Sequence, residues 1–292
     1  MKPILVPVDF SKPAEHAARY AVQLSKIMKS NMVLCHAFLA PTEAVGSAQI
    51  AWPLVEYATL DEMYKAQLND LLSKLEIYHQ AISGADSFHP VILCAAEMGN
   101  TIEVIKHLAA DKKAGLIVMG MSGAGAVSRF FMGSVSRQLL EKARCPVLLI
   151  PKNYTFKPVK KIGFATDLNE GDIKVINSFV DLAEILGADL VICHVTDHLH
   201  DTVLHNKESE EFIIEVRNKI NYDSIYFRHI ESYDIDEGLE WLTREGHIDM
   251  LAMVHHQKGL WGRIFDSSHT KKIVGHIPLP LLVFPAGVHF TF

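Results

Sequence analysis

The chain contains the same strand-like segments twice and in the same order, which limits the folds open to it. The stretch "ILVPVDFS" at 4–11 returns as "IGFATDLN" at 162–169, and "MVLCHA" at 32–37 returns as "LVICHV" at 190–195. Both pairs are 158 residues apart. Segments that recur at a fixed spacing are the mark of duplicated structural units, so the sequence indicates two copies of one domain.

A further pair of matching segments lies near the ends of the two copies. "CPVLLIP" at 145–151 is answered by "LPLLVFP" at 279–285, only 134 residues later. The first copy therefore carries 24 extra residues, which we place in a long loop around 38–60, ahead of a helix. We predict two domains, at residues 1–152 and 158–292, joined by a short polar linker that ends in a proline.

Within each copy, short apolar runs alternate with segments whose apolar residues have helical spacing. In the first copy the apolar runs, which we expect to be strands, lie at 3–9, 31–38, 89–95, 115–120 and 146–151. Ser11 is the expected N-cap of the first helical segment, and Asn100 or Thr101 is the expected N-cap of the segment at 100–114. Strands that are apolar almost throughout indicate a parallel sheet covered on both faces. The predicted fold class is α/β, with two tandem doubly wound, five-stranded parallel-sheet domains. We expect their last strands to pair antiparallel, because this pairing removes two exposed sheet edges.

Composition excludes several classes of function. The net charge is −6 and no run of Lys or Arg is present, which argues against a nucleic-acid-binding surface. No apolar stretch reaches the roughly 20 residues that cross a bilayer. The N-terminus has Pro and Asp where a signal peptide needs an apolar core, so we expect a cytoplasmic protein without a membrane partner. Four cysteines lack metal-binding spacing, and we expect buried, reduced thiols.

A cluster of glycines follows the fourth predicted strand. Gly120 ends that strand, Gly123 follows, and Gly133-Ser134 opens the next helix. Ligands of doubly wound sheets bind beyond the carboxyl ends of the strands, and a helix N-terminus favours a phosphate. Ser134 and Ser136 would add hydroxyl donors there, and Asp9 at the same edge could accept hydrogen bonds from a ribose. The alternative is a flexible turn in which Gly133 only relieves crowding. The spacing matches neither a Walker loop nor the Rossmann fingerprint.

These residues carry a resemblance to a known family. Gly120, Gly123 and Gly133-Ser134 match the nucleotide motif G-2x-G-9x-G-[S/T] of the universal stress protein (UspA) family. The N-terminal "VPVDFS" and the flanking "LIVMG" and "CPVLLIP" are also similar to that family, and the resemblance covers essentially the whole chain as a tandem of two domains. It implies an adenine-nucleotide α-hydrolase-like fold that holds ATP with a divalent cation, expected to be Mg²⁺, and has no firmly assigned reaction.

The resemblance also implies which residues of the first copy meet the nucleotide. Pro7, Val8 and Asp9 would border the adenosine, and Ala37, just after the second strand, matches a family position against adenine. The ribose and phosphate cradle would comprise Met119, Gly120, Gly123, Gly133, Ser134, Val135 and Ser136. Where the family often has a basic residue, this chain has Met121-Ser122, which leaves phosphate neutralisation to Arg129, Arg137 or a metal ion.

The second copy lacks this motif. Val254, Gln257 and Ser267 stand where the first copy has its three motif glycines, although Asp167 corresponds to Asp9. Side chains would block the close approach of backbone to phosphate, so we predict that the second copy does not bind ATP in the family's manner. A weaker alternative is another anion near Ser267, assisted by Lys271 or Lys272.

The sixteen histidines invite a metal hypothesis. His255-His256 could meet His269 and His276, or the "DHLHD" stretch at 197–201, near one sheet edge. No helical HxxxH or HExxH spacing is present, however, so we expect surface and capping histidines and no metal site. His36 and His194 recur at equivalent positions, which favours a structural role for both.

The leading hypothesis is a stress-response protein whose first copy binds ATP and whose second copy is a structural or regulatory partner. One alternative is a slow ATPase, although no carboxylate or histidine beside Gly133 is a convincing catalytic residue. Another is a protein-interaction module with a vestigial nucleotide site, in which the 38–60 segment, with Trp52 and Tyr57, is a docking surface rather than a lid. The sequence leaves a homodimer open.

Overall fold

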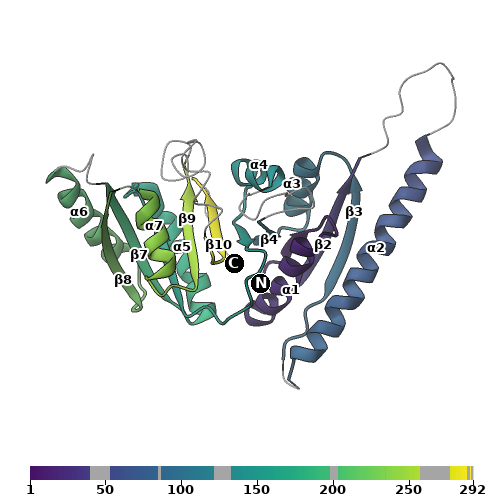
Figure 1. Ribbon diagram of the computed structural model, residues 1–292, viewed down its shortest axis with the longest axis horizontal. Helices are drawn as coiled ribbons and strands as arrows, with labels where there is room; N and C mark the ends of the chain where they lie inside the picture. Colours follow the sequence, from purple (N-terminus) through teal and green to yellow (C-terminus); the bar gives the residue numbers. More distant parts are fainter. Residues whose placement is uncertain are drawn as a thin grey trace, which may run out of the picture.

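The computed structural model of the chain describes most of its residues. They are residues 1–39, 53–84, 87–121, 133–197, 203–233, 235–256 and 277–287, together with Phe290 and Phe292. The duplicated strands and helices seen in the sequence fall within these ranges, and Figure 1 shows their arrangement in space.

One ten-stranded sheet runs through the whole molecule. The first copy contributes five parallel strands in the order β3-β2-β1-β4-β5. Their bounds are β1 Ile4–Pro7, β2 Met32–Phe38, β3 Ile92–Met98, β4 Leu116–Gly120 and β5 Val147–Ile150. The order reverses between β1 and β4, so the carboxyl ends of these two neighbours form the switch point where ligands of such sheets bind.

The second copy repeats this order in the other half of the sheet. Its strands are β6 Lys161–Ala165, β7 Asp189–Asp197, β8 Ile225–Ser232, β9 Met250–His255 and β10 Leu281–Pro285. They are parallel in the order β10-β9-β6-β7-β8. The two halves meet where β10 pairs antiparallel with β5, which confirms the predicted pairing of the last strands and leaves neither as an open edge.

Helices cover both faces of the sheet. They are α1 Lys12–Met28, α2 Pro53–Ile82, α3 Thr101–Asp111, α4 Ser134–Lys142, α5 Glu170–Leu186, α6 Val203–Lys219 and α7 Ile235–Arg244. Buried side chains of α1, α2, α5 and α6 belong to one apolar core, and those of α3, α4 and α7 belong to the core on the opposite face. This two-faced burial explains why the strands are apolar along their whole length.

The helices that follow the first strand of each copy begin in the same way. Ser11 caps α1, where its hydroxyl accepts a hydrogen bond from the Ala14 amide, and Asn169 caps α5 through the Gly171 amide. The residue before each cap, Phe10 or Leu168, is in the left-handed region, with φ of 58° and 63°. The two copies therefore share the sharp turn that connects strand to helix, as well as the strands themselves.

Two details differ from the sequence prediction. Helix α2 begins at Pro53, so the segment expected to be loop around 38–60 already includes two turns of helix. Proline is well tolerated at the first helical position because its missing N–H has no partner there, which places the start earlier than the apolar pattern suggested. Ala37, which the family resemblance placed just after the second strand, lies inside β2, which continues to Phe38 as the predicted strand at 31–38 does.

Candidate functional site

The carboxyl ends of β1 and β4 bring together two predicted site residues, Asp9 and Gly120. Asp9 lies two residues beyond β1 and is exposed, while Pro7 ends β1 and Val8 is buried directly after it. The Asp9 carboxylate accepts hydrogen bonds from the backbone amide and the hydroxyl of Ser11. The turn that caps α1 therefore also holds this carboxylate at the sheet edge.

An aromatic cluster lies beside Asp9 and was not anticipated from the sequence. The centroid of the His36 ring lies 4.6 Å from that of Phe10 and 4.5 Å from that of Tyr64. The ring centroids of Phe38 and Tyr64 are 4.9 Å apart. His36 Nδ1 donates to the Val8 carbonyl at 2.7 Å. The ring of His36 thus ties the end of β2 to the end of β1, which supports the expected structural role.

Gly120 meets the first turn of α1 so closely that a side chain would not fit. A Cβ atom at this position would lie 2.9 Å from the carbonyl oxygen of Pro13, well inside the normal contact distance. Gly120 is therefore needed for the packing of β4 against α1.

The residues that flank the glycine-rich segment, Met121 and Gly133, are hydrogen-bonded to each other at the end of β4. The Gly133 amide donates to the Met121 carbonyl at 3.0 Å, and the Met121 amide donates to Ile150 at the end of β5. The two ends of segment 122–132 are therefore hydrogen-bonded to each other directly beside β4. Gly123 and Arg129, which were predicted to contact phosphate, lie outside the described residues.

Helix α4 begins with a glycine that offers no side-chain cap. Gly133 is the N-cap residue, and its extended backbone, with φ of −60° and ψ of 154°, makes no side-chain capping bond. Ser134 is exposed at the first helical position, whereas Ser136 is buried and its hydroxyl donates to the Gly120 carbonyl at 3.4 Å. The amides of a helix start that lacks a cap are available to an anion.

The remaining predicted residues surround this helix start. Met119 is buried in β4, Val135 is half-buried in α4, and Ala37 in β2 lies two strands away from Met119. Arg137 is also half-buried, and its Nε atom is inaccessible to solvent without a hydrogen-bond partner among the described residues. The structure thus brings the described members of the predicted set to one edge of the first copy.

The equivalent edge of the second copy keeps part of this arrangement. His194 Nδ1 donates to the Thr166 carbonyl at 3.0 Å, as His36 does to Val8 in the first copy. Val254 replaces Gly120 and is buried at the end of β9. Six residues that the sequence analysis singled out in this copy lie outside the described residues: Gln257, Ser267, His269, Lys271, Lys272 and His276.

A buried acid–base pair occupies the second copy's edge. His256 Nε2 and Asp172 Oδ1 are 2.6 Å apart, and the Thr166 hydroxyl donates to Asp172 Oδ2 at 2.7 Å. Asp172 is only 1% exposed. Burial raises the pKa of the Asp172 carboxyl, although its two hydrogen bonds oppose this, and the hydrogen bond to Asp172 raises the pKa of His256.

Comparison with known proteins agrees with this duplicated architecture. The model of the universal stress protein family matches the chain twice, at residues 1–151 and 158–285. The chain belongs to the universal stress protein family. The two matches follow the two halves of the sheet, so the protein is a tandem member with two copies of the family's domain in one chain.

Individual universal stress proteins match half of the chain or all of it. A relative from Thermus aquaticus is 30% identical over 149 residues, which are 51% of this chain and 98% of that protein. One from Methanocaldococcus jannaschii is 26% identical over 52% of this chain and 82% of that protein. The crystal structure of a universal stress protein from Archaeoglobus fulgidus is 17% identical, covers 98% of this chain and 96% of that chain, and superposes with a TM-score of 0.63, which shows the shared fold.

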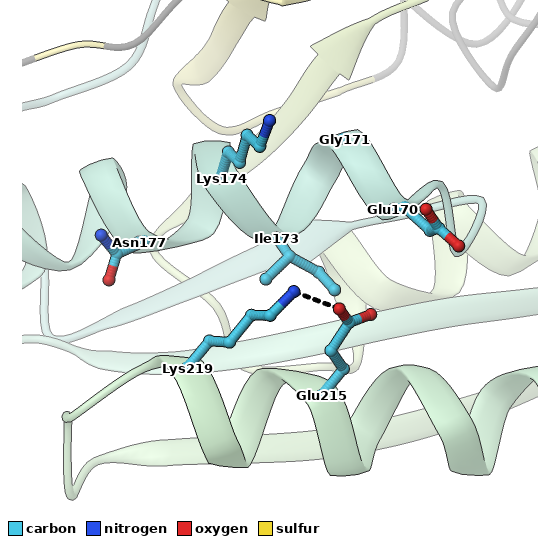
Figure 2. Close-up of a pocket in the computed structure, with 7 residues that line it drawn as sticks. All are labelled: Glu170, Gly171, Ile173, Lys174, Asn177, Glu215 and Lys219. Carbon is cyan, nitrogen blue, oxygen red and sulfur yellow. Dashed lines mark hydrogen bonds and ion pairs between the residues drawn. The ribbon is translucent and has the colours of Figure 1, made fainter.

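Two grooves of this universal stress protein lie away from the glycine-rich edge. One, of about 480 Å³, runs between α5 and α6 (Figure 2). Ile173 points there toward the ion pair of Lys219 with Glu215, while Lys174 points away from it. The other, of about 660 Å³, lies between the end of β8 and α7 beside Trp241. The ion pair joins two residues of α6, and the polar side chains of Glu170, Lys174 and Asn177 on α5 complete the lining of the first groove.

The described helices include none with the length and apolar composition of a membrane-spanning segment.

The four cysteines are all free thiols. Cys35, Cys145 and Cys193 are buried as predicted, while Cys94 is half-buried.

Sequence reasoning missed the Asp172–His256 pair because the two residues are 84 positions apart. A comparison of the two copies would have drawn attention to Asp172, since it corresponds to Ala14.

Proposed function

We propose that the first copy of this universal stress protein binds an adenine nucleotide, ATP with Mg²⁺, and that the second copy is its structural or regulatory partner in a stress-response protein. The single observation that carries this proposal is the start of α4. There, an uncapped glycine N-terminus lies directly against the end of β4, beside the switch point of the sheet.

The chemistry of this edge suits a nucleotide. Amides at the start of α4 and the Ser134 hydroxyl would donate to phosphate oxygens, and the helix dipole favours their negative charge. Asp9, held by Ser11 across the switch point, would accept hydrogen bonds from ribose hydroxyls. The glycine at position 120 lets β4 pack directly against the first turn of α1 beside these two groups.

The base would lie toward β2. Pro7 and Val8 follow one another at the end of β1, and Ala37 lies near the end of the neighbouring β2. Ala37 packs against the core on the face of the sheet that α4 covers, whereas Val8 and Phe10 pack against the opposite core. Apolar side chains at this edge would contact the flat face of a purine. Met119, Gly120, Gly123, Gly133, Ser134, Val135 and Ser136 would form the remaining cradle.

Mg²⁺ would enter with the nucleotide. Magnesium retains several of its waters and is commonly held by substrate phosphates with few protein ligands, so this edge does not need a dedicated cage. The metal would neutralise the phosphate charge that Met121-Ser122 cannot, with Arg137 as the nearest described cation on α4. The residues of the first copy are therefore compatible with a metal–nucleotide complex.

The test is calorimetric titration of the full chain with ATP in the presence of Mg²⁺. We expect one site per chain, and we expect a Gly133→Val variant to bind at least about tenfold more weakly, because a side chain at the helix start displaces the phosphate from its amides. The backbone at Gly133 is extended, so valine fits it without strain.

The matched control is Gln138→Val, which adds the same side chain to the exposed face of α4. It should bind ATP like the unaltered protein. Failure of the unaltered protein to bind, or equal binding by the Gly133→Val variant, would overturn the proposal and favour the protein-interaction module. Two sites per chain would contradict the assignment of the second copy as the partner without a nucleotide.

A further inference from the structure

Three potential metal ligands converge at the sheet edge of the second copy. They come from different elements: Asp167 from the turn after β6, Asp172 from the first turn of α5, and His256 from the end of β9. One carboxylate oxygen of each aspartate and one ring nitrogen of His256 all lie within 4.8 Å of one another. A shift of about 1 Å in such side chains is enough to place three ligand atoms around one ion.

The two carboxylates differ in the hydrogen bonds that they receive from the protein. Asp172 accepts hydrogen bonds from Thr166 and His256. The Oδ1 atom of Asp167, in contrast, is inaccessible to solvent and has no hydrogen-bond partner within the described part of the chain. A buried carboxylate oxygen without a partner is costly, and a bound cation is one way in which proteins compensate for it.

The charges of the cluster also favour a cation. Two carboxylates lie beside a single imidazole, so the three groups keep a net negative charge even when His256 is protonated. The Thr166 hydroxyl donates a hydrogen bond to Asp172 and accepts one from the Leu168 amide. The bond from Thr166 fixes the orientation of the Asp172 carboxylate. Residues that hydrogen-bond to metal ligands commonly orient those ligands in this way.

The first copy provides an internal comparison. It keeps the aspartate, as Asp9, but has Val8, Ala14 and Ser122 where the second copy has Thr166, Asp172 and His256. Two of these replacements introduce ligand atoms and the third introduces the hydroxyl that holds one of them. The second copy has thus exchanged the features of a nucleotide edge for a set of polar groups that face one another.

We infer that the second copy binds one divalent transition-metal ion of the zinc class through Asp167, Asp172 and His256. One imidazole nitrogen and two carboxylate oxygens are a ligand set that Zn²⁺ accepts, whereas Mg²⁺ and Ca²⁺ favour oxygen ligands alone. On binding, the metal takes the place of the proton on His256 Nε2, and this proton passes to solvent. Water would complete the coordination.

This inference does not rest on the proposed nucleotide function. The metal site lies in the second copy and the nucleotide edge in the first, so either can fail without the other. Experiments on the metal are therefore made without nucleotide, which removes any ion carried by phosphate groups.

The test uses the full chain after removal of metals with a chelator. Zn²⁺ affinity and stoichiometry are measured by competition with a chromophoric chelator, and Co²⁺ absorption spectra report directly on the ligands. We expect one ion per chain. Asp167→Asn, Asp172→Asn and His256→Gln should each weaken Zn²⁺ binding at least about tenfold, which is the smallest loss seen when even an outer partner of a metal ligand is altered. Each should also change the Co²⁺ visible spectrum.

Matched controls remove the same groups elsewhere. Asp181→Asn neutralises an exposed carboxylate on α5, and His107→Gln removes a histidine of α3 that pairs with Glu97. Both should bind Zn²⁺ like the unaltered chain. Because Asp172 is buried, its variant is checked by circular dichroism, and the half-buried Asp167 gives an independent test. Absence of micromolar Zn²⁺ binding, or equal binding and equal Co²⁺ spectra in the three site variants, would overturn the inference.

Discussion

Leu149 of the first copy lies directly opposite Leu281 of the second, in the antiparallel pair that joins the two halves of the sheet. Both side chains are fully buried in the core on the α3, α4 and α7 face. The neighbouring pair, Leu148 with Leu282, points into the opposite core. The two copies are therefore joined through both cores as well as through backbone hydrogen bonds.

This junction should be as important for stability as the interior of either copy. We expect Leu282→Ala to lower the free energy of unfolding by about 2–5 kcal/mol, since it leaves a cavity between two strands. Chemical denaturation followed by tryptophan fluorescence measures the change. Leu39→Ala, at a residue that is 73% exposed, is the control and should change little. Equal effects of both variants would contradict an essential junction.

The histidines at positions 36 and 194 should act as structural donors. His36→Phe keeps an aromatic ring beside Phe10 and Tyr64 but leaves the Val8 carbonyl without its donor. We expect a loss of about 0.5–1.5 kcal/mol of stability, the usual net value of one hydrogen bond. His194→Phe should cost a similar amount through Thr166. Thermal unfolding measures both, and a variant as stable as the parent would show that the bond contributes nothing.

Gly120 should not tolerate even the smallest side chain. The Cβ atom of Gly120→Ala would press on the Pro13 carbonyl, which belongs to backbone and cannot move alone. We expect a cost of about 1–3 kcal/mol from overpacking. At Gly84 the nearest atom to a new Cβ is 3.9 Å away, so Gly84→Ala serves as the control and should be nearly neutral. The comparison is made by urea denaturation of the two variants in parallel.

The Asp172–His256 pair should show strong coupling in metal-free protein. His256→Ala leaves a carboxylate buried with only the Thr166 hydroxyl as partner, and we expect it to cost about 3–5 kcal/mol. The double variant with Asp172→Ala, which restores the first copy's residue, should cost less than the sum of the single changes. A double-mutant cycle from denaturation curves measures the coupling, and strictly additive effects would show that the two groups act independently.

The thiols should differ in reactivity toward a disulfide reagent. Burial raises the pKa of Cys145 and of Cys193 to about 12 each, and it raises the pKa of Cys35 further. Cys94 is only half-buried, so we expect it to react first in the native protein. The other three should react only after denaturation. Rapid modification of more than one thiol under native conditions would contradict this order.

The position of α2 shows where local sequence patterns reach their limit. The apolar spacing identified this helix but placed its start too late, because the residues from Pro53 onward add little amphipathic signal ahead of the regular repeat. By contrast, Ser11 was correctly predicted as the cap of α1, and Asn100 was one of the two predicted candidates for the cap of α3, since a capping side chain bonds to amides two or three residues away. Features that depend on near neighbours can be read from the sequence.

Some residues of the candidate sites could also be predicted from the sequence, and others could not. Asp9, Gly120 and Gly133 could be placed at one edge because each directly follows or precedes an element whose direction in a parallel sheet is known. Nothing in the local sequence pairs Asp172 with His256, since their contact requires α5 and β9 to pack side by side. The aromatic cluster of Phe10, His36 and Tyr64 likewise joins three elements.

The sequence alone therefore determined the duplication, the parallel strands, the antiparallel join and the family to which the chain is similar. All of these follow from periodicity, from short-range capping and from repeated segments. Only the tertiary structure decided which polar groups meet, as Asp172 and His256 do in the second copy, because burial selects contacts between residues far apart in the chain and requires each buried charge to find a partner.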